Sequence, residues 1–368
     1  KSNVPAIRFK GFTDAWEQRK VAELFRVTRG YVLAATQTEV SKTDENPYPV
    51  YSSQTKDKGL MGYYKDYLYE DAITWTTDGA NAGTVNYRAG KFYCTNVCGV
   101  LLSNEVEANQ MIAEALNNVA KGYVSYVGNP KLMNNVMADI LIQIPKQAEE
   151  RKHLSSFFAN LDNLITLHQR KYEQLINIKK SLLEKMFPAD GEDKPKIRFK
   201  GFTDAWEQRK LGEYCFITTG KLDANAMVAD GAYDFYTSGI AKYKINTPAF
   251  VGPAITIAGN GATVGYMHLA NGLFNAYQRT YVLSNFSADR QYLYYVVGTK
   301  LPYKIAQEAR AGNIPYIVMD MLTELDLNMP SIEEQKRIGL LFFNLDNLIT
   351  LHQRKLEMLK NIKKSLLE

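Results

Sequence analysis

A long helix is the first element that the hydrophobic pattern predicts. From residue 149 to about residue 186 the chain contains no proline or glycine, and apolar residues recur every three or four positions, which is helical spacing. Pro145 precedes this run, as proline often precedes a helix start. Such a helix would be on the order of 55 Å long. The stripe consists of Leu154, Phe157, Leu161, Leu164, His168, Leu175, Ile178 and Leu182.

A second stripe of the same kind follows Pro330. It consists of Ile338, Leu341, Leu345, Leu348, His352, Leu359, Ile362 and Leu366. Heptad-like stripes that continue for about five turns favour a coiled coil over an ordinary surface helix. We therefore predict that the two helices pack on each other as an antiparallel spacer between two globular segments. His168 and His352 would set the register of that pairing.

The globular segments show a different pattern, with short β-rich runs separated by glycine and asparagine turns. The clearest runs are AITW, KFYCTNVCGVLL, FVGPAITIAG and QRTYVLSNF. Helical stretches at 105–119 and 289–300 complete the pattern. An α+β fold with a curved sheet is therefore predicted for each segment.

Three strings occur twice without a change. IRFKGFTDAWEQRK fills 7–20 and 197–210, LDNLITLHQRK fills 161–171 and 345–355, and NIKKSLLE fills 177–184 and 361–368. The chain is therefore two tandem modules, each made of an opening box, a divergent domain and a long helix. We call the opening boxes and long helices the frame. The expected boundaries are 1–144 for the first box and domain, 145–187 for the first helix, 188–196 for a linker, 197–329 for the second box and domain, and 330–368 for the second helix.

The two divergent domains are distant relatives of each other. They share a short set of aligned residues: Thr28 and Gly30 with Thr218 and Gly220, 72–74 with 254–256, Gly79-Ala80 with Gly261-Ala262, Gly83 with Gly265, and Asn129 with Asn313. A fixed frame that carries two different inserts indicates a protein that recognises two different binding targets, one with each insert.

The excess positive charge of the chain lies in the frame and not in the inserts. The net charge is +5, but segment 21–144 has 10 Lys and Arg against 13 Asp and Glu, and segment 211–329 has 8 against 9. The frame therefore carries the whole positive surplus, and charge alone does not identify a DNA-binding protein.

No catalytic or metal motif stands out. A phosphate-binding GxxxxGK[ST] loop is absent from the sequence, and the glycines of GANAG and GNGATVG lack the strand and helix that flank a dinucleotide site. Cys94 and Cys98 have no partners at zinc spacing, and Asn46-Pro47-Tyr48 lacks a proline and the cofactor loop of an amino-methyltransferase. Three cysteines cannot form a disulfide framework and fit a reducing cytoplasm, and no apolar run approaches membrane-spanning length. We therefore expect a cytoplasmic binding protein without catalytic residues, metal or membrane contact.

The sequence of the frame resembles that of the DNA-specificity (S) subunit of type I restriction-modification systems. The box IRFKGF followed by tryptophan looks like the opening of that family's modules, and P…EEQKRI…LDNLI, from Pro330 to Ile349, is similar to their ending. The first copy departs at Glu150-Arg151, which stand where the second has Glu334-Gln335. The pattern of the inserts, T-G near the start, AI-T followed by two glycines, and G-N near the end, also resembles the family's target recognition domains.

The resemblance implies a definite role. Such subunits hold two target recognition domains apart on an antiparallel helical spacer, and each domain reads one half of a gapped double-stranded DNA sequence. The frame binds two modification subunits, which carry S-adenosylmethionine and methylate adenine. Two restriction subunits, which use ATP and Mg, join them. The chain itself would hold no cofactor.

Candidate DNA-reading residues are the polar and basic residues of loops between β-like runs, because Asn and Gln can pair with adenine and Arg or Lys with guanine. In the first domain they are Arg29, Gln54, Lys56, Lys58, Asn81, Asn96, Asn129 and Lys131. In the second they are Lys221, Ser238, Lys242, Lys244, Asn260, Gln278, Arg279, Arg310 and Asn313. The same residue types are also common in loops for other reasons, so any of these candidates could instead be a solvated loop residue or a turn former. Candidate partner-binding residues are Phe9, Phe12, Trp16, Phe199, Phe202 and Trp206, with the exposed helix faces; equally, these aromatic residues could be core residues that dock each box onto the opposite module.

Two other functions stay open at this stage. A catalytic DNA methyltransferase or nuclease would bind S-adenosylmethionine or cleave DNA by itself. A coiled-coil scaffold with two protein-binding domains would suit the weakly acidic inserts and would show no salt-dependent binding to duplex DNA.

Overall fold

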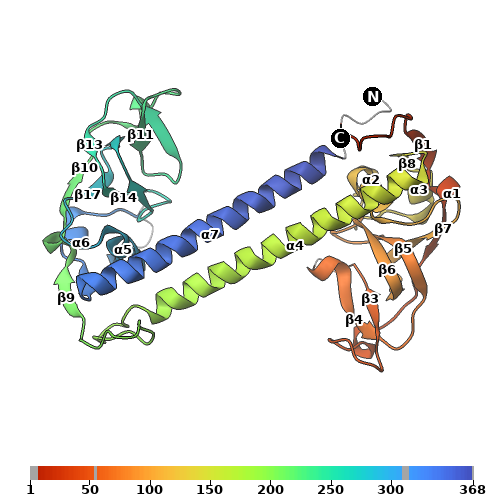
Figure 1. Cartoon of the computed structure of the whole chain (residues 1–368), viewed down its shortest axis with the longest axis horizontal. Helices are drawn as coiled ribbons and strands as arrows, with labels where there is room; N and C mark the ends of the chain where they lie inside the picture. Colours follow the sequence, from red (N-terminus) through yellow and green to blue (C-terminus); the bar gives the residue numbers. More distant parts are fainter. Residues whose placement is uncertain (1–6, 54–55, 309–314, 367–368) are drawn as a thin grey trace. The chain divides into compact units, whose positions relative to one another are not determined.

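The computed structural model describes residues 7–53, 56–308 and 315–366 and divides into two compact units. The first unit consists of residues 1–169 with 354–368, and the second consists of residues 170–353. The units do not coincide with the two modules, because each unit contains part of both long helices. Figure 1 labels the elements of both units.

The first unit is built on a six-stranded sheet with the order β2-β7-β5-β6-β3-β4. Its neighbouring strands are antiparallel except β3 and β6, which pair in parallel. A separate antiparallel pair joins β1 to β8. The strands are β1 (Glu17–Lys20), β2 (Phe25–Arg29), β3 (Tyr48–Tyr51), β4 (Leu60–Tyr64), β5 (Tyr69–Thr76), β6 (Val85–Cys94), β7 (Cys98–Ser103) and β8 (Leu141–Ile144).

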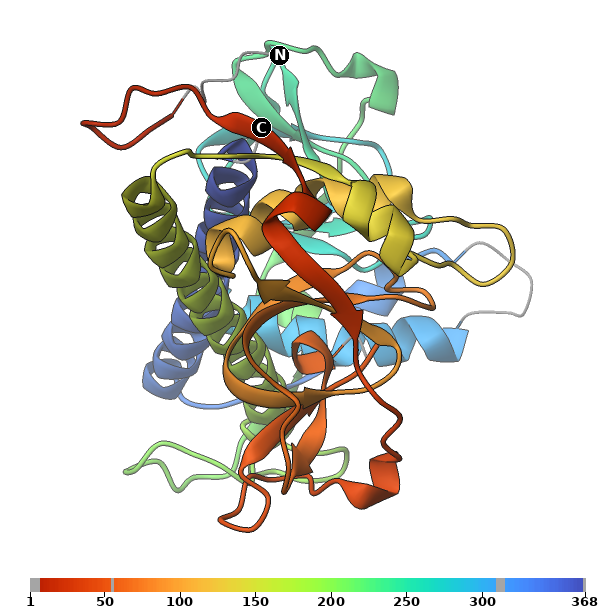
Figure 2. The same ribbon diagram turned by 90° about the vertical axis from the view of Figure 1, so that its right-hand side faces the viewer.

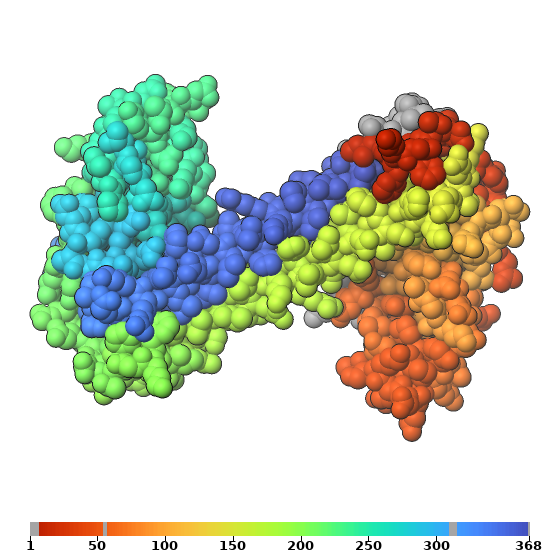
Figure 3. Space-filling model, in the orientation of Figure 1, coloured from red at the N-terminus to blue at the C-terminus, as the bar shows by residue number. Residues whose placement is uncertain are grey.

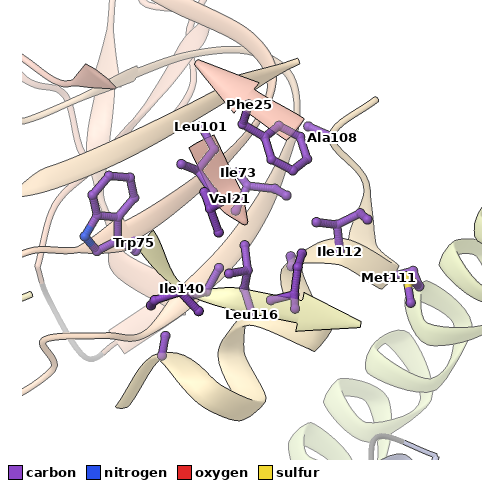
Figure 4. Packing of buried hydrophobic residues seen from close by; sticks show 14 of the residues in the cluster. Val21, Phe25, Ile73, Trp75, Leu101, Ala108, Met111, Ile112, Leu116 and Ile140 are labelled. Atoms are coloured by element: carbon purple, nitrogen blue, oxygen red, sulfur yellow. The ribbon is translucent and has the colours of Figure 1, made fainter. Parts of the chain in front are cut away.

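Helix α2 covers this sheet and closes the core of the first unit. Leu116 and Ile112 on α2 pack with Ile73, Trp75 and Leu101 of the strands, all essentially inaccessible to solvent (Figure 4). The helix begins at Gln110, later than the predicted residue 105, because the Asn109 side chain accepts a hydrogen bond from the Ile112 amide and caps it. The helices are α1 (Val21–Leu24), α2 (Gln110–Ala120) and α3 (Asn134–Asp139), with 3-10 turns η1 (Ala35–Gln37), η2 (Lys56–Gly59) and η3 (Lys121–Tyr123).

The second unit contains two four-stranded sheets, ordered β10-β17-β14-β15 and β12-β11-β16-β13, and an antiparallel pair of β9 and β18. The strands are β9 (Glu207–Lys210), β10 (Phe216–Thr219), β11 (Tyr233–Tyr236), β12 (Lys242–Ile245), β13 (Phe250–Val251), β14 (Ala254–Ala258), β15 (Met267–Ala270), β16 (Leu273–Ala276), β17 (Thr280–Ser284) and β18 (Asp326–Met329). Its shorter helices are α5 (Arg290–Glu308) and α6 (Met319–Thr323), with 3-10 turns η4 (Leu211–Glu213) and η5 (Ala224–Ala226).

The two units share a topology, which confirms the α+β prediction for both inserts. The order β2-β7-β5-β6 in the first unit matches β10-β17-β14-β15 in the second. In the first unit β6 runs unbroken and holds both parts of the sheet together. In the second unit residues 271–272 belong to neither β15 nor β16 and the sheet is split in two there, although Gly272 (φ +64°) and Gly90 within β6 (φ +71°) have similar backbone conformations. The run KFYCTNVCGVLL is likewise two strands, because the Cys98 amide donates to the Thr95 carbonyl in a turn.

The long helices are α4 (Ala148–Lys185) and α7 (Ile332–Ser365). In the first unit the beginning of α4 lies beside the end of α7, where Lys363 contacts Asp162. In the second unit the end of α4 lies beside the beginning of α7, where Lys179 contacts Asp346. The helix segments therefore run antiparallel within each unit, as predicted.

The predicted seam of these helices is only partly right. Leu154, Leu161, Ile338, Leu345 and Leu359 are buried, but Leu164, Ile178, Leu348 and Ile362 are between 38% and 47% exposed. Phe158, Phe342 and Leu356, which the predicted stripes omit, are buried. The strict heptad stripe fails because the recognition domains, as well as the other helix, pack on α4 and α7. The buried face therefore turns toward residues such as Phe158 and Phe342, which lie in the cores of the two units.

Candidate nucleic-acid interface

Loops at one end of the first unit's sheet are tied together by hydrogen bonds. The Arg29 guanidinium donates to the Asn96 carbonyl (3.2 Å), the Asn81 amide donates to the Ser53 carbonyl (3.1 Å), and the Gly79 N–H donates to the Pro130 carbonyl (2.9 Å). We call this set the first loop cluster; it comprises residues 29–31, 52–53, 78–83, 95–97 and 129–131. Five segments that lie far apart in the sequence therefore present one surface.

The second unit builds an equivalent set from different residues. The Ser238 hydroxyl contacts Asn260 Oδ1 (2.7 Å), the Gly259 N–H donates to the Arg279 carbonyl (2.8 Å), and the Gln278 N–H donates to the Leu222 carbonyl (2.8 Å). We call this set the second loop cluster; it comprises residues 220–222, 237–240, 259–263, 277–279 and 315–316. The Gly261 N–H donates to the Pro315 carbonyl as Gly79 does to Pro130.

Glycines shared by the two inserts explain why both clusters form. A Cβ atom at Gly30 would collide with the Cys94 carbonyl, and one at Gly220 would collide with the Ala276 carbonyl. Gly79 and Gly261 have φ near +90°, a backbone conformation that favours glycine. The repeated glycines therefore build the turns, and the residues between them are free to differ.

Most of the predicted DNA-reading residues lie in these clusters. Arg29, Asn129 and Lys131 are exposed in the first, and Lys221, Gln278 and Arg279 are exposed in the second. Asn81, Asn96, Ser238 and Asn260 are half-buried; Asn81, Ser238 and Asn260 use side-chain atoms to hold the loops together, whereas Asn96 contributes its backbone carbonyl. Lys131 also lies 3.8 Å from Asp78.

The remaining candidates lie elsewhere or outside the described residues. Lys58 contacts Asp162 on α4 at 3.6 Å, Lys244 pairs with Asp234 at 2.8 Å, and Lys242 lies over the Tyr236 ring at 5.5 Å. Lys56 lies in η2. Gln54, Arg310 and Asn313 lie outside the described residues.

Two positioning side chains were missed by the sequence reasoning. Arg88 is buried, lies 3.6 Å from the centre of the Tyr51 ring, and donates to Thr74 Oγ1 and the Lys58 carbonyl. His268 Nε2 lies 3.5 Å from the Gly239 carbonyl in the second loop cluster. Burial lowers the pKa of both side chains. The sequence gives no signal for either role, because a lone Arg or His in a strand is ordinary.

The opening boxes dock on the starts of the long helices through the same buried ion pair. Arg8 makes two hydrogen bonds to Glu150 on α4 (2.7 and 2.8 Å), and Arg198 makes the same two to Glu334 on α7. Both carboxylates are essentially inaccessible to solvent. Each box therefore docks on the helix of its own module, rather than only on the opposite module.

The aromatic residues of the boxes differ in accessibility. Phe9 is 38% exposed and packs edge-on against Phe157 and His153. Phe12 also packs edge-on against His153. Trp206 is buried against Phe187 and Tyr292. Trp16, Phe199 and Phe202 are half-buried, as is Phe12.

The frame also has a stripe of exposed apolar residues that occurs once on α4 and once on α7. Leu164 and Leu167 on α4, in the first unit, are 43% and 51% exposed, and the equivalent Leu348 and Leu351 on α7, in the second unit, are 44% and 46% exposed. Figure 3 draws the atoms of α4 in yellow-green and those of α7 in blue. We call these four residues the repeated stripe.

Membrane-spanning helices and metal-ligand clusters are both absent from the part of the chain that the structure describes. None of its helices is long and apolar enough to cross a membrane. Among residues 7–53, 56–308 and 315–366, no three His, Cys, Asp or Glu side chains gather as metal ligands would.

Comparisons with known proteins agree with this arrangement. The family model of the type I restriction modification DNA specificity domain matches residues 13–177 and again 203–361. The chain is 38% identical over 134 residues to the type I restriction enzyme EcoDI specificity subunit of Escherichia coli, a stretch that covers 36% of this chain and 30% of that subunit. It is 21% identical over 397 residues to the MjaVIII specificity subunit of Methanocaldococcus jannaschii, covering 96% and 91% of the two chains.

A solved structure has the same fold. The crystal structure of the type I restriction-modification system S subunit from M. genitalium superposes with a TM-score of 0.74 at 16% identity, covering 99% of this chain and 97% of that one. The family model accounts for most of both modules, including the loop clusters and the long helices. The chain therefore belongs to the type I restriction-modification DNA specificity family and carries one such domain in each module.

Proposed function

We propose that this chain is a non-catalytic specificity subunit that recognises a bipartite, gapped double-stranded DNA sequence. The first target recognition domain, within 1–144, reads one half-site through the first loop cluster, and the second, within 197–329, reads the other through the second loop cluster. The observation that carries this proposal is that two equivalent loop clusters are built on the same glycines but display different polar residues.

The chemistry of the exposed residues supports base reading more than phosphate binding. Arg29 and Arg279 can each form two hydrogen bonds with guanine, and Gln278 can do so with adenine. Lys58, Lys131 and Lys244 lie close to carboxylates, which reduces the positive charge available for phosphates. We propose that partner subunits supply most of the phosphate contacts.

Those partners, in this proposal, are two modification subunits that bind the frame. The repeated stripe supports this arrangement, because identical residues with nearly equal exposure on α4 and α7 suit two copies of one partner. S-adenosylmethionine belongs to the modification subunits, and ATP and Mg to two restriction subunits; this chain holds no cofactor. The complex acts on DNA in the cytoplasm.

DNA recognition is tested by single-molecule methylation sequencing of cells that carry the reconstituted complex. The expected result is adenine methylation at a gapped, two-part motif. Arg29→Ala should relax one half of that motif and Arg279→Ala the other, with about 1–3 kcal/mol lost per base contact. Lys336→Ala is the control, because Lys336 lies on α7 and pairs with Glu333.

Several outcomes would contradict the proposal. Methylation by the chain alone would make it an enzyme. Failure of the complex to retain duplex DNA even at low salt would favour a protein-binding scaffold. DNA affinity falls steeply as the salt concentration rises, so low salt is the condition in which DNA binding would be strongest.

Partner binding is tested by stoichiometry. Leu167→Asp and Leu351→Asp occupy equivalent positions, so each alone should remove one modification subunit and the double variant both. Lys171→Ser with Lys355→Ser, at exposed polar positions of the same strings, should leave the complex intact. Native mass spectrometry measures the outcome, and a double variant that keeps both partners would refute the assignment of the repeated stripe.

A further inference from the structure

One segment of the first recognition domain differs from the rest in charge. Residues 121–138 contain Lys121 and Lys131 and no carboxylate, whereas segment 21–144 as a whole has more acidic than basic residues. This segment follows α2 and includes most of α3, and the loop between the two helices projects from the first unit (Figure 2). The segment therefore carries a small positive charge on an otherwise weakly acidic domain, although Lys131 lies 3.8 Å from Asp78, outside the segment.

The tip of the segment holds two apolar side chains in solvent. Val127 is 93% exposed and Tyr126 is 70% exposed. Leaving a valine in water forgoes the roughly 1.5–3 kcal/mol that its burial would contribute. An aliphatic side chain at the tip of a cationic loop suits a contact made with another molecule.

The base of the tip is held in place. Ser125 and Lys131 exchange two backbone hydrogen bonds (2.8 and 2.9 Å), and the Leu132 N–H donates to the Thr77 carbonyl (2.8 Å). The Trp75 indole N–H donates to the Leu132 carbonyl (3.1 Å) in the core. The tip therefore extends from the first loop cluster on a fixed base and needs little ordering to bind.

We propose that the tip, residues 125–131, enters the major groove and that Val127 packs on the 5-methyl group of a thymine in the half-site read by the first domain. This inference rests on the proposed function. Thymine is the base whose major-groove edge carries a methyl group, and apolar side chains recognise it there. Lys121 is exposed near the base of the tip, so it can face a phosphate beside the groove, whereas Lys131 lies 3.8 Å from Asp78 and contributes less charge there.

The sequence of the second module supports a role in specificity. Gly128-Asn129 aligns with Gly312-Asn313, but the two preceding residues are Tyr126-Val127 in one module and Arg310-Ala311 in the other. Chemically different residues at the two aligned positions are what two different half-sites require.

The test replaces each thymine of the first half-site with uracil, which lacks the methyl group. The probe is a duplex carrying the methylated motif found in cells, and the protein is the full chain with its modification partner. For the wild type, one uracil should weaken binding about four-fold, as expected for one methyl group. For Val127→Ser, thymine and uracil at that position should bind equally.

Val40→Ser is the matched control. Val40 is 92% exposed in the same unit but follows Glu39 and precedes Asp44 and Glu45, so its substitution should leave the thymine preference unchanged. Both substitutions are at exposed positions and should leave folding intact.

The inference is overturned if the first half-site contains no thymine, if no uracil weakens binding by the wild type, or if Val127→Ser keeps the thymine preference. Each of these results leaves motif-specific methylation, and hence the proposed function, in place. Loss of any motif preference in the wild-type complex would instead overturn the proposed function.

Discussion

Lys179 Nζ lies 2.5 Å from Asp346 Oδ1, and the same two string positions pair again as Lys363 and Asp162 at 2.6 Å. Each lysine comes from one copy of NIKKSLLE, and each aspartate comes from the other module's copy of LDNLITLHQRK. The repeated strings therefore supply complementary halves of one contact, which fixes the register of the antiparallel helix segments in both units.

The two ion pairs differ in their third member, which predicts unequal stability costs. Lys363 also contacts Glu114 (2.7 Å), whereas Asp346 accepts a hydrogen bond from the Tyr295 hydroxyl (2.7 Å). Lys363→Met removes the cation between Asp162 and Glu114, which then share the neutral Gln110 amide as donor (2.9 and 2.7 Å), with Lys58 3.6 Å from Asp162. The substitution should therefore cost about 1–3 kcal/mol. Lys179→Met leaves Asp346 hydrogen-bonded to Tyr295 and should cost below about 1 kcal/mol. Urea unfolding followed by circular dichroism compares them, and equal costs would refute this account.

The buried ion pair between each opening box and its helix should be far more sensitive. Glu334→Gln removes the charge that compensates Arg198, whose side chain is 14% exposed, so the loss should be about 3 kcal/mol. Glu333→Gln on the same turn removes only an exposed contact with Lys336 and should cost below about 0.5 kcal/mol. Thermal unfolding of the two variants should therefore differ by several degrees; indistinguishable midpoints would argue against the pair.

Histidine 268 should make the second unit sensitive to acid. Burial lowers its pKa, the nearby Lys242 lowers it further, and the bond to Gly239 and the charge of Asp234 oppose these effects. As the pH falls below about 6.5, the ordinary His pKa, the unfolded chain takes up a proton before the folded chain does. Stability is therefore lost until the pH passes the folded pKa.

The measurement is the urea midpoint at pH 7 and pH 5. The wild type should lose more stability over this interval than His268→Gln, which does not titrate. An identical loss in both proteins would show that His268 does not carry the effect.

All three cysteines should be unreactive in the folded protein. Burial raises the pKa of Cys98 to about 11 and that of Cys215 to about 12, and it raises the pKa of Cys94 further. Thiolates are the reactive form, so a thiol reagent at pH 8 should label the native chain slowly and the urea-unfolded chain at once. Ser41→Cys adds a cysteine at an exposed position as a positive control. Rapid labelling of the native wild type would contradict the burial of these thiols.

Much of the frame could be predicted from the sequence, because identical strings must fold alike. The buried face of each long helix could not be predicted. Heptad spacing alone does not show that Phe158 and Phe342 turn into the cores while Leu164 and Leu348 stay exposed. Burial there depends on what the recognition domains contribute, such as Met111 of α2 in the first unit and Tyr292 of α5 in the second.

The loop clusters could be located but not resolved residue by residue. Asparagine beside glycine indicated turns correctly, yet Asn81 uses its side-chain amide to hold Ser53, a partner 28 residues away that no local pattern reveals. Val127 was overlooked for the opposite reason: a valine in sequence suggests a strand, and its exposure follows only from the hydrogen-bonded base beneath it.

The composition of the units carries a consequence for biosynthesis. The second unit is one continuous segment, residues 170–353, whereas the core of the first unit includes Leu359 from the last segment of the chain. At roughly 5–20 residues per second, a ribosome needs on the order of 10–40 s to proceed from residue 169 to residue 354. The domain translated first must therefore wait, with part of its apolar surface uncovered, until the domain translated second has been made.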